Sequence, residues 1–503
     1  MIPIKTFIKN YWLLITIWLI GLFFRCYRQN QMLSFYYDQG RDALMATDII
    51  NFKHFPAIGP TTGIQGLLLG PLWYYLITPG YLLSRGNPAY AAWFISLIES
   101  FSIPLIYLIL EKYWHKNSGY LGAFFWSFSY YLIRSSRWFS NPSPLPTVVF
   151  LLILCLIKIF QEKKYHYSIP LAFLLGVALQ LEAASAIFFF PIIGLIALLN
   201  FSTSKKISYQ LYLKSFFAFF ILLIPQILFE FKNKFIVTQA FLGFLTGKVN
   251  SDTGKSWAVP SIKFVGRRLI DYYEIFFSKL DTNTTISSTI FLIIFTFGLF
   301  FLLKKLPQST FIQIIVIWLF LPLVLLLFFV GNYGTLYDYY LTGLFPAFFL
   351  LFTMGLTVFA LNIFSLITVV GVIGLFINGN LSFTKNYITA GTDGPSNVSL
   401  GNEILAVDYV CQQYKEKPFT LNIYVPPVIP YSYNYLFYWR TSQKLCSEPK
   451  TDSNSPHLSL YEIDPDHPSR LNPWLNEQEK IGKIVDVHRF GGIIIQSRTR
   501  SSL

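Results

Sequence analysis

The stretch YWLLITIWLIGLFFRCY, residues 11–27, is an apolar run of the length that crosses a bilayer as one helix. Only 13% of the 503 residues are charged, whereas a soluble domain carries about 25%. The sequence therefore predicts a polytopic α-helical membrane protein with about eleven transmembrane helices. Similar runs occupy residues 91–110, 119–133, 144–160, 169–182, 185–200, 215–231, 288–303, 311–330, 341–359 and 362–378.

Lysines mark one side of the predicted membrane segments. If the N-terminus is cytoplasmic, five successive inner ends carry them, and the positive-inside rule is obeyed throughout. An odd number of spans then places the C-terminal part outside a multi-pass cell (plasma) membrane protein. The net charge of +14 is spread over many loops, so nucleic acid is not a predicted partner. These lysines are Lys5, Lys9, Lys112, Lys116, Lys163, Lys164, Lys205, Lys206, Lys214, Lys304 and Lys305.

Two domains are expected from the change in composition along the chain. Residues 1–380 form a transmembrane domain with long outer loops at 28–90 and 232–288, and residues 381–503 form a small extracytoplasmic α/β domain. Within the second loop, apolar residues at helical spacing over 261–280 predict an amphipathic helix on the membrane surface. In the C-terminal domain we expect a helix at 404–414, strands at 420–425 and 492–497, and a loop at 448–473. Cys411 and Cys446 either pair or remain free thiols.

The segment Asp38-Gln39-Gly40-Arg41-Asp42 is the strongest candidate site. Charge beside a membrane is costly unless it faces water, a partner or a substrate. Helical spacing would put Asp38, Arg41 and Asp42 on one face, directly before a helix expected at 43–51. A carboxylate that takes a proton beside a cation that binds phosphate suits glycosyl transfer from a phosphate-linked donor. The alternative is a solvated loop without a catalytic role.

The sequence from Asp38 to Ala43 resembles the first-loop Asp-Glu-x-Arg-Tyr-Ala pattern of GT-C class membrane glycosyltransferases, which include lipid A aminoarabinose transferases and protein O-mannosyltransferases (glycosyltransferase family 39). Residues 70–76, GPLWYYL, are similar to the Pro-Pro-Leu-Tyr-Tyr segment of that class. The resemblance implies a polyprenyl-phosphate sugar donor and an outer active site, with Asp38 in the catalytic position. Gln39 and Asp42 replace the Glu and Tyr of the pattern, so the second acid is either Asp42 or a carboxylate from another loop.

Five residues at other span ends are candidates for substrate binding. Arg137 and Trp138, in a short outer loop, suit a phosphate and a sugar ring, but they would equally anchor helices at the interface. Glu182 ends one span at a depth where a carboxylate usually faces a cavity or partner. Lys232 either contacts the lipid phosphate or snorkels to the interface. Tyr339 lies over the predicted cavity or in the aromatic belt.

These features together predict a glycosyltransferase, hexosyl or pentosyl, that moves a sugar from polyprenyl phosphate to a hydroxyl on a protein, lipid or glycan of the cell envelope. No cofactor and no metal ligand set is predicted from the sequence. A polysaccharide polymerase or ligase is a rival, although its charged catalytic loop would be expected late in the span series. A lipid-linked sugar flippase is a rival of another class, which would be expected to show internal repeats and mid-membrane charges.

Overall fold

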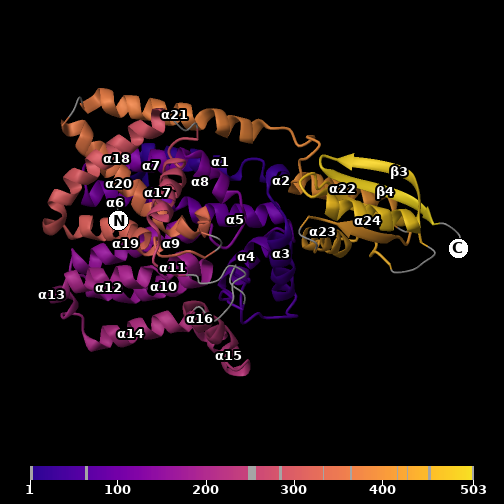
Figure 1. The fold of residues 1–503 in the computed structure, drawn as a ribbon, viewed down its shortest axis with the longest axis horizontal. Coiled ribbons are helices and arrows are strands. Elements are labelled where there is room, and N and C mark those ends of the chain that lie inside the picture. The colour runs from indigo at the N-terminus through magenta and orange to yellow at the C-terminus, as the bar shows by residue number, and fades with distance from the viewer. Residues whose placement is uncertain are drawn as a thin grey trace.

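The computed structural model describes residues 4–62, 66–246, 257–282, 286–331, 334–362, 365–415, 417–426, 429–450 and 455–500. Parts of the predicted second outer loop, 247–256 and 283–285, lie outside the described residues. A bundle of helices makes up most of the molecule, and the C-terminal sheet lies at one end of its long axis (Figure 1).

Six helical stretches among the described residues are long and apolar enough to cross a membrane: 9–32, 88–113, 209–232, 286–308, 338–361 and 367–389. Four shorter apolar helices cover 145–160, 165–181, 183–199 and 310–326. The predicted span at 119–133 is divided at Ser129, which caps the second of two helices with its hydroxyl. The chain is thus a multi-pass membrane protein by helix length and composition, while the number of eleven spans stays a prediction.

The helices of the membrane part follow one another with short connections. They are α1 (Ile4–Cys26), α2 (Gln29–Met32), α3 (Tyr37–Ile50), α4 (Leu72–Leu83), α5 (Pro88–Ser100), α6 (Ser102–Tyr113), α7 (Ser118–Phe128), α8 (Tyr130–Ser136), α9 (Leu145–Phe160), α10 (Ser168–Leu181), α11 (Ala183–Ala186), α12 (Phe189–Leu199), α13 (Phe201–Ser204), α14 (Tyr209–Phe220), α15 (Ile224–Lys232), α16 (Ile236–Thr246), α17 (Ile262–Phe277), α18 (Ile286–Lys305), α19 (Thr310–Leu326), α20 (Phe345–Asn362) and α21 (Ser365–Thr389).

The C-terminal part is an α/β unit, as expected. Its helices are α22 (Leu400–Gln413), α23 (Tyr431–Ser442) and α24 (Pro468–Ile481), and its strands are β1 (Thr420–Tyr424), β2 (His457–Glu462), β3 (Gly482–Phe490) and β4 (Ile493–Arg500). The strand order is β1-β2-β4-β3, with β1 and β2 parallel and the other pairs antiparallel. A disulfide joins Cys411 to Cys446, which resolves the alternative left by the sequence.

One expectation for this unit is wrong. The predicted loop at 448–473 contains β2 and the first residues of α24. Every residue of β2, an inner strand of the sheet, is buried, so the strand shows no alternation of exposed polar residues. Pro468 stands in the first turn of α24, where a missing N–H is harmless, so the proline does not prevent the helix.

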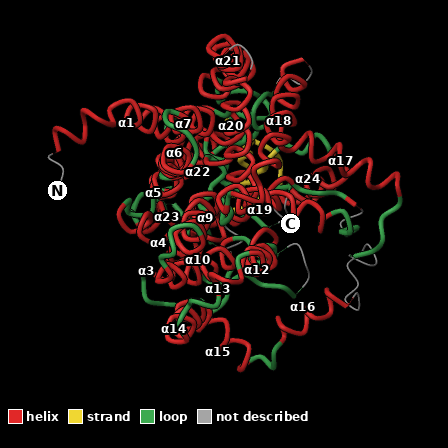
Figure 2. Tube along the Cα trace, turned by 90° about the vertical axis from the view of Figure 1, so that its left-hand side faces the viewer, coloured by secondary structure: helices red, strands yellow, loops and turns green. Residues whose placement is uncertain are grey.

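The two parts of the molecule meet where α3 packs on α23. The helices α14, α15 and α16 lie at the margin of the bundle, away from α18 and α20 (Figures 1 and 2). The predicted amphipathic helix at 261–280 is present as α17. It buries Arg268, Tyr272, Phe276 and Phe277 against the protein and leaves Ile262 and Leu269 exposed.

Candidate active site

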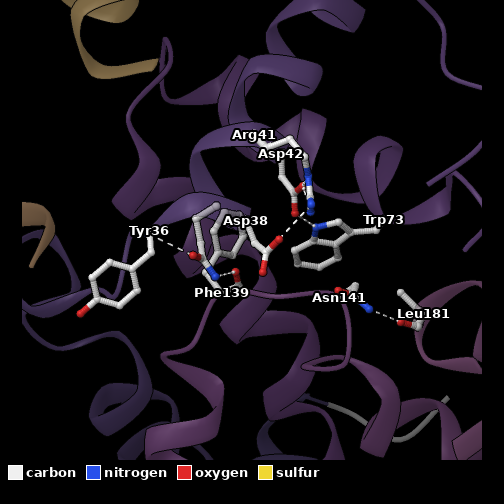
Figure 3. Close-up of polar contacts among 9 residues, drawn as sticks. Tyr36, Asp38, Arg41, Asp42, Trp73, Phe139, Asn141 and Leu181 are labelled. Atoms are coloured by element: carbon white, nitrogen blue, oxygen red, sulfur yellow. Dashed lines mark hydrogen bonds and ion pairs between the residues drawn. The ribbon is translucent and has the colours of Figure 1, made fainter. Parts of the chain in front are cut away.

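The cluster from Asp38 to Asp42 lies in the first turns of α3, which begins six residues before the expected helix. The reason is Gln39: its Oε1 accepts from the backbone N–H of Tyr36, the N-cap residue, at 3.1 Å. Its Nε2 donates to the carbonyl of Phe139 at 3.0 Å and ties α3 to the loop after α8. Gln39 is therefore a structural link at the position where the resembling pattern has a glutamate (Figure 3).

Arg41 lies between two carboxylates. Its Nη1 is 2.9 Å from Oδ1 of Asp38, and its Nη2 is 2.7 Å from Oδ1 of Asp42. Spacings of three and four residues place Arg41 and Asp42 on the helix face of Asp38, as the sequence predicted, and the long Arg41 side chain reaches both carboxylates. The side chains of Asp38, Arg41 and Asp42 are 60%, 19% and 4% exposed. Asp38 thus faces solvent, whereas Asp42 is enclosed.

The enclosed carboxylate of Asp42 accepts a second hydrogen bond, from Nε1 of Trp73 at 2.7 Å (Figure 3). Burial raises the pKa of Asp42 to about 6, because the charged form loses its hydration. The bonds from Arg41 and Trp73 oppose that rise, since both favour the ionised form. Asp42 is therefore a buried anion that holds the guanidinium of Arg41 in place.

The segment GPLWYYL brings Trp73 to this position by starting α4. Pro71 is the residue before the helix, and the backbone N–H of Leu72 donates to Oε1 of Gln180 at 3.1 Å. A Cβ on Gly70 would lie 2.4 Å from the side chain of Gln180, so glycine leaves the room that this contact uses. The segment GPLWYYL therefore supplies the side chain that donates a hydrogen bond to Asp42 in the first motif.

Asn141 and Glu182 lie at the C-terminal end of α10. The amide of Asn141 donates to the carbonyl of Leu181 at 2.5 Å, close to Asp38 in the same view (Figure 3). Glu182 is buried and accepts from the N–H of Ala184 at 3.1 Å, so it caps α11. In α11, the hydroxyl of Ser185 donates to the carbonyl of Tyr340 at 2.7 Å.

Tyr339 stands beside this contact, in the turn from Asp338 to Leu344 that precedes α20. Its ring packs against those of Tyr337 and Tyr340, with centroids 5.6 and 4.6 Å away. A series of contacts from Asn141 through α11 to this turn thus joins Tyr339 to the site. The role of Tyr339 in substrate binding stays a prediction.

Lys279, just after α17, is a candidate residue that the sequence analysis missed. Its ammonium lies over the rings of Tyr131 and Phe345, 4.4 and 5.0 Å from their centroids. Nζ donates to Oδ2 of Asp338 at 3.3 Å. Burial lowers the pKa of Lys279; Asp338 opposes this and Arg134 adds to it. In the sequence, Lys279 is recognisable only as a lone lysine that follows an aromatic helical turn.

Three other predicted residues are not brought to the Asp38 cluster by any contact described. The guanidinium of Arg137 is buried 4.7 Å from the ring centroid of Tyr387 on α21. Trp138 is about half exposed beside it. Lys232 is exposed at the end of α15, at the margin of the bundle (Figure 1). Within the described part of the chain, no group of three acidic, His or Cys residues is arranged to hold a metal ion.

Comparison with known proteins finds a matching family model and several similar solved structures. The family model described as dolichyl-phosphate-mannose-protein mannosyltransferase matches residues 69–229. ArnT from Cupriavidus metallidurans, in structures bound to undecaprenyl phosphate and in the apo state, is similar to the chain with a TM-score of 0.59 and 11% identity. Each comparison covers 97% of this chain and 98% of ArnT. No curated protein matches the chain. The predicted resemblance to GT-C class membrane glycosyltransferases is thereby confirmed.

Proposed function

We propose that the protein is a membrane glycosyltransferase that moves a sugar from a polyprenyl-phosphate donor to an acceptor hydroxyl at the outer face of the membrane. The observation that carries this proposal is the pair of unlike carboxylates on α3, one exposed and one buried, joined by Arg41. The ArnT-like fold and the family match support a lipid-linked donor. An exposed carboxylate, anchored at a fixed position, is what a general base needs.

In the proposed reaction, Asp38 accepts the proton of the acceptor hydroxyl. The acceptor oxygen forms a bond to the anomeric carbon as the bond from that carbon to the phosphate oxygen breaks. Polyprenyl phosphate leaves with the electron pair of the broken bond. Asp42 and Trp73 keep Arg41 beside Asp38, so that the carboxylate stays ionised and correctly directed.

The departing phosphate needs positive charge that the α3 cluster supplies only in part. Arg41 is shared by two carboxylates, which leaves those three side chains net negative when all are ionised. Lys279 faces one carboxylate, Asp338, and has Arg134 in its electrostatic surroundings. Contacts through α11 and Tyr340 connect this lysine to the site. We therefore assign the exposed Arg134 to the donor phosphate, with the buried Lys279 adding positive charge to its surroundings. Arg137, whose buried guanidinium nitrogens have no hydrogen-bond partner among the described residues, is the second candidate.

An apolar groove gives the lipid part of the donor a place in this proposal. It measures about 500 Å³ and lies between α10, α12 and α14, with Leu175, Phe190 and Phe219 among its lining residues. Helix α10 ends at Leu181, which accepts the hydrogen bond from Asn141 in the site. A chain in the groove would thus run along the helix whose last residue accepts the hydrogen bond from Asn141.

The test is transfer or release of sugar from a panel of polyprenyl-phosphate sugars by the purified protein, read by mass spectrometry. Asp38→Asn should lower turnover by about 10²–10⁴, the usual contribution of a general base. Asp48→Asn, on the same helix, is the matched control and should leave turnover unchanged. Equal turnover in wild type and Asp38→Asn would remove Asp38 from the mechanism. Failure of every donor, with acceptor extracts present, would favour a transporter.

A further inference from the structure

Helix α3 rests on α23 through a contact of backbone against backbone. A Cβ at Gly40 would lie 2.3 Å from the backbone N of Ser432 and 2.3 Å from the carbonyl carbon of Tyr431. The rings of Tyr37 and Tyr431 meet beside this point with centroids 4.9 Å apart. Gly40 lies between Asp38 and Arg41, so the contact with α23 supports the turn of α3 that carries both of those side chains.

Further contacts hold α23 against the first outer segment of the chain. The hydroxyl of Tyr435 donates to the carbonyl of Gly86 at 2.5 Å. Nε1 of Trp439 donates to the carbonyl of Arg85 at 2.9 Å. The C-terminal part therefore holds the segment after α4 as well as α3 itself.

Two buried carboxyl groups lie beneath α23 and have no role in the proposed chemistry. Glu403, on α22, is fully buried, and the side chain of Ser432 on α23 is the hydrogen-bonding group that faces its carboxyl. Glu462, on β2, is also buried, and its Oε1 accepts from the hydroxyl of Tyr433 at 3.0 Å. Burial, together with the charge of Glu462, raises the pKa of Glu403 well above its usual range. Burial raises the pKa of Glu462 to about 7.

The surroundings of Glu403 leave a proton as the means of neutralising it. The groups that face it are Glu462 on β2, Ser432 and Tyr433 on α23, and Tyr36 at the N-cap of α3. None of these is a cation. A buried carboxylate without a counter-charge is strongly unfavourable, and two adjacent carboxyl groups cannot both ionise cheaply. One shared proton removes the repulsion and keeps the packing under Tyr433.

We propose that Glu403 is a positioning residue: with Glu462 it holds one proton beneath α23, and α23 in turn sets Asp38 and Arg41 for the reaction. The kinetic part of this inference rests on the proposed function. The mechanical part, that α23 determines the order of α3, rests on the packing alone, so the two are separable by experiment.

The experiment compares wild type with Glu403→Gln, Glu403→Ala and Gly40→Ala in turnover and in hydrogen exchange of peptides covering residues 37–50, corrected for the intrinsic effect of pH. The control is Asp408→Asn, which removes an ion pair between α22 and α23 formed with Arg440 at 2.6 Å. Glutamine is neutral at every pH and has nearly the shape of a protonated glutamate. Apparent thermal midpoints are recorded between pH 5 and 8.

Glu403→Gln should keep turnover and exchange within about twofold of wild type at pH 6. Glu403→Ala and Gly40→Ala should raise exchange of α3 and lower kcat about tenfold while KM for the donor changes less than about twofold. The control should lower the thermal midpoint without changing exchange of α3. The unfolded chain releases the glutamate proton near pH 4 and the folded chain retains it, so the wild-type midpoint should fall relative to Glu403→Gln, by about 3 °C or more, between pH 5 and 8.

Several results would overturn the inference. Unchanged exchange of α3 in both Glu403→Ala and Gly40→Ala would show that α23 does not order α3. Equal losses in Glu403→Gln and Glu403→Ala at pH 6 would show that a charged carboxylate is needed. A difference in midpoint that does not vary with pH would exclude the retained proton. If no donor is turned over by any protein, the proposed function fails, while the exchange data still decide the coupling.

Discussion

Replacing Trp73 with phenylalanine removes one of the two side chains that donate hydrogen bonds to the buried carboxylate of Asp42. It keeps an aromatic ring against Phe139, where the two ring centroids are 5.5 Å apart in the wild type. A hydrogen bond to an ionised group contributes about 1.5–3 kcal/mol. Each pKa unit corresponds to about 1.4 kcal/mol, so the pKa of Asp42, about 6 in the intact site, should rise by about one to two units.

The sign of the effect follows from which form of Asp42 holds Arg41. Only the carboxylate pairs with the guanidinium, so turnover should increase as pH rises through the pKa of Asp42. In Trp73→Phe this increase should move to higher pH by about one to two units, and turnover should approach the wild-type value at the alkaline end. Stability should respond as well. Because the folded pKa lies above the ordinary value, stability falls as pH rises toward it, and the fall should continue to higher pH in the variant.

The assay is the pH dependence of kcat/KM for the donor between pH 5 and 9. Trp126→Phe is the matched control, since Nε1 of Trp126 donates to the hydroxyl of Ser102 at 2.6 Å in a buried position remote from α3. The control should lose stability without moving the acidic limb of the profile. If the acidic limb of the kcat/KM profile stays in place in Trp73→Phe, or moves to lower pH, the role given to Asp42 is refuted.

Two further predictions concern other parts of the molecule. Lys279→Met keeps the apolar stem between Tyr131 and Phe345 but removes the positive charge. In a donor titration, KM for the donor should therefore rise about tenfold or more, with a smaller change in kcat. An unchanged KM would remove Lys279 from the phosphate site. Replacing both Cys411 and Cys446 with serine opens a loop of 35 residues, and the chain-entropy model gives a loss of stability of about 4 kcal/mol. The thermal midpoint should therefore fall. An equal midpoint would show that the disulfide does not stabilise the protein.

Much of the membrane part is predictable because each helix is specified by its own residues. An apolar run of sufficient length signals a span without reference to the rest of the chain. The exceptions depend on single polar side chains. The hydroxyl of Ser129 starts a new helix within a predicted span, and Gln39 caps α3 earlier than its apolar pattern suggests. In the C-terminal part, β2 was missed because both of its faces are buried and its two partner strands are distant in sequence.

The candidate site is predictable only where its residues are close in sequence. The spacing of Asp38, Arg41 and Asp42 specifies their common face on any helix. Trp73 and Asp42 are 31 residues apart in the sequence, and Lys279 and Asp338 are 59 residues apart. No local sequence pattern therefore predicts either contact. The role of Arg137 stays a prediction: its guanidinium lies on the ring of Tyr387, and none of its nitrogens has a hydrogen-bond partner among the described residues.

The unequal exposure of the two aspartates bears on the question of a second catalytic acid. Chemistry on a substrate requires a group that the substrate can reach, and Asp38 satisfies this with 60% of its side chain exposed. Asp42 is 4% exposed, and both of its oxygens already accept hydrogen bonds, from Arg41 and from Trp73. A proton transferred to Asp42 would break the contacts that hold Arg41 and, through it, Asp38. The arrangement therefore favours a single base, with the second aspartate acting on that base through the guanidinium between them.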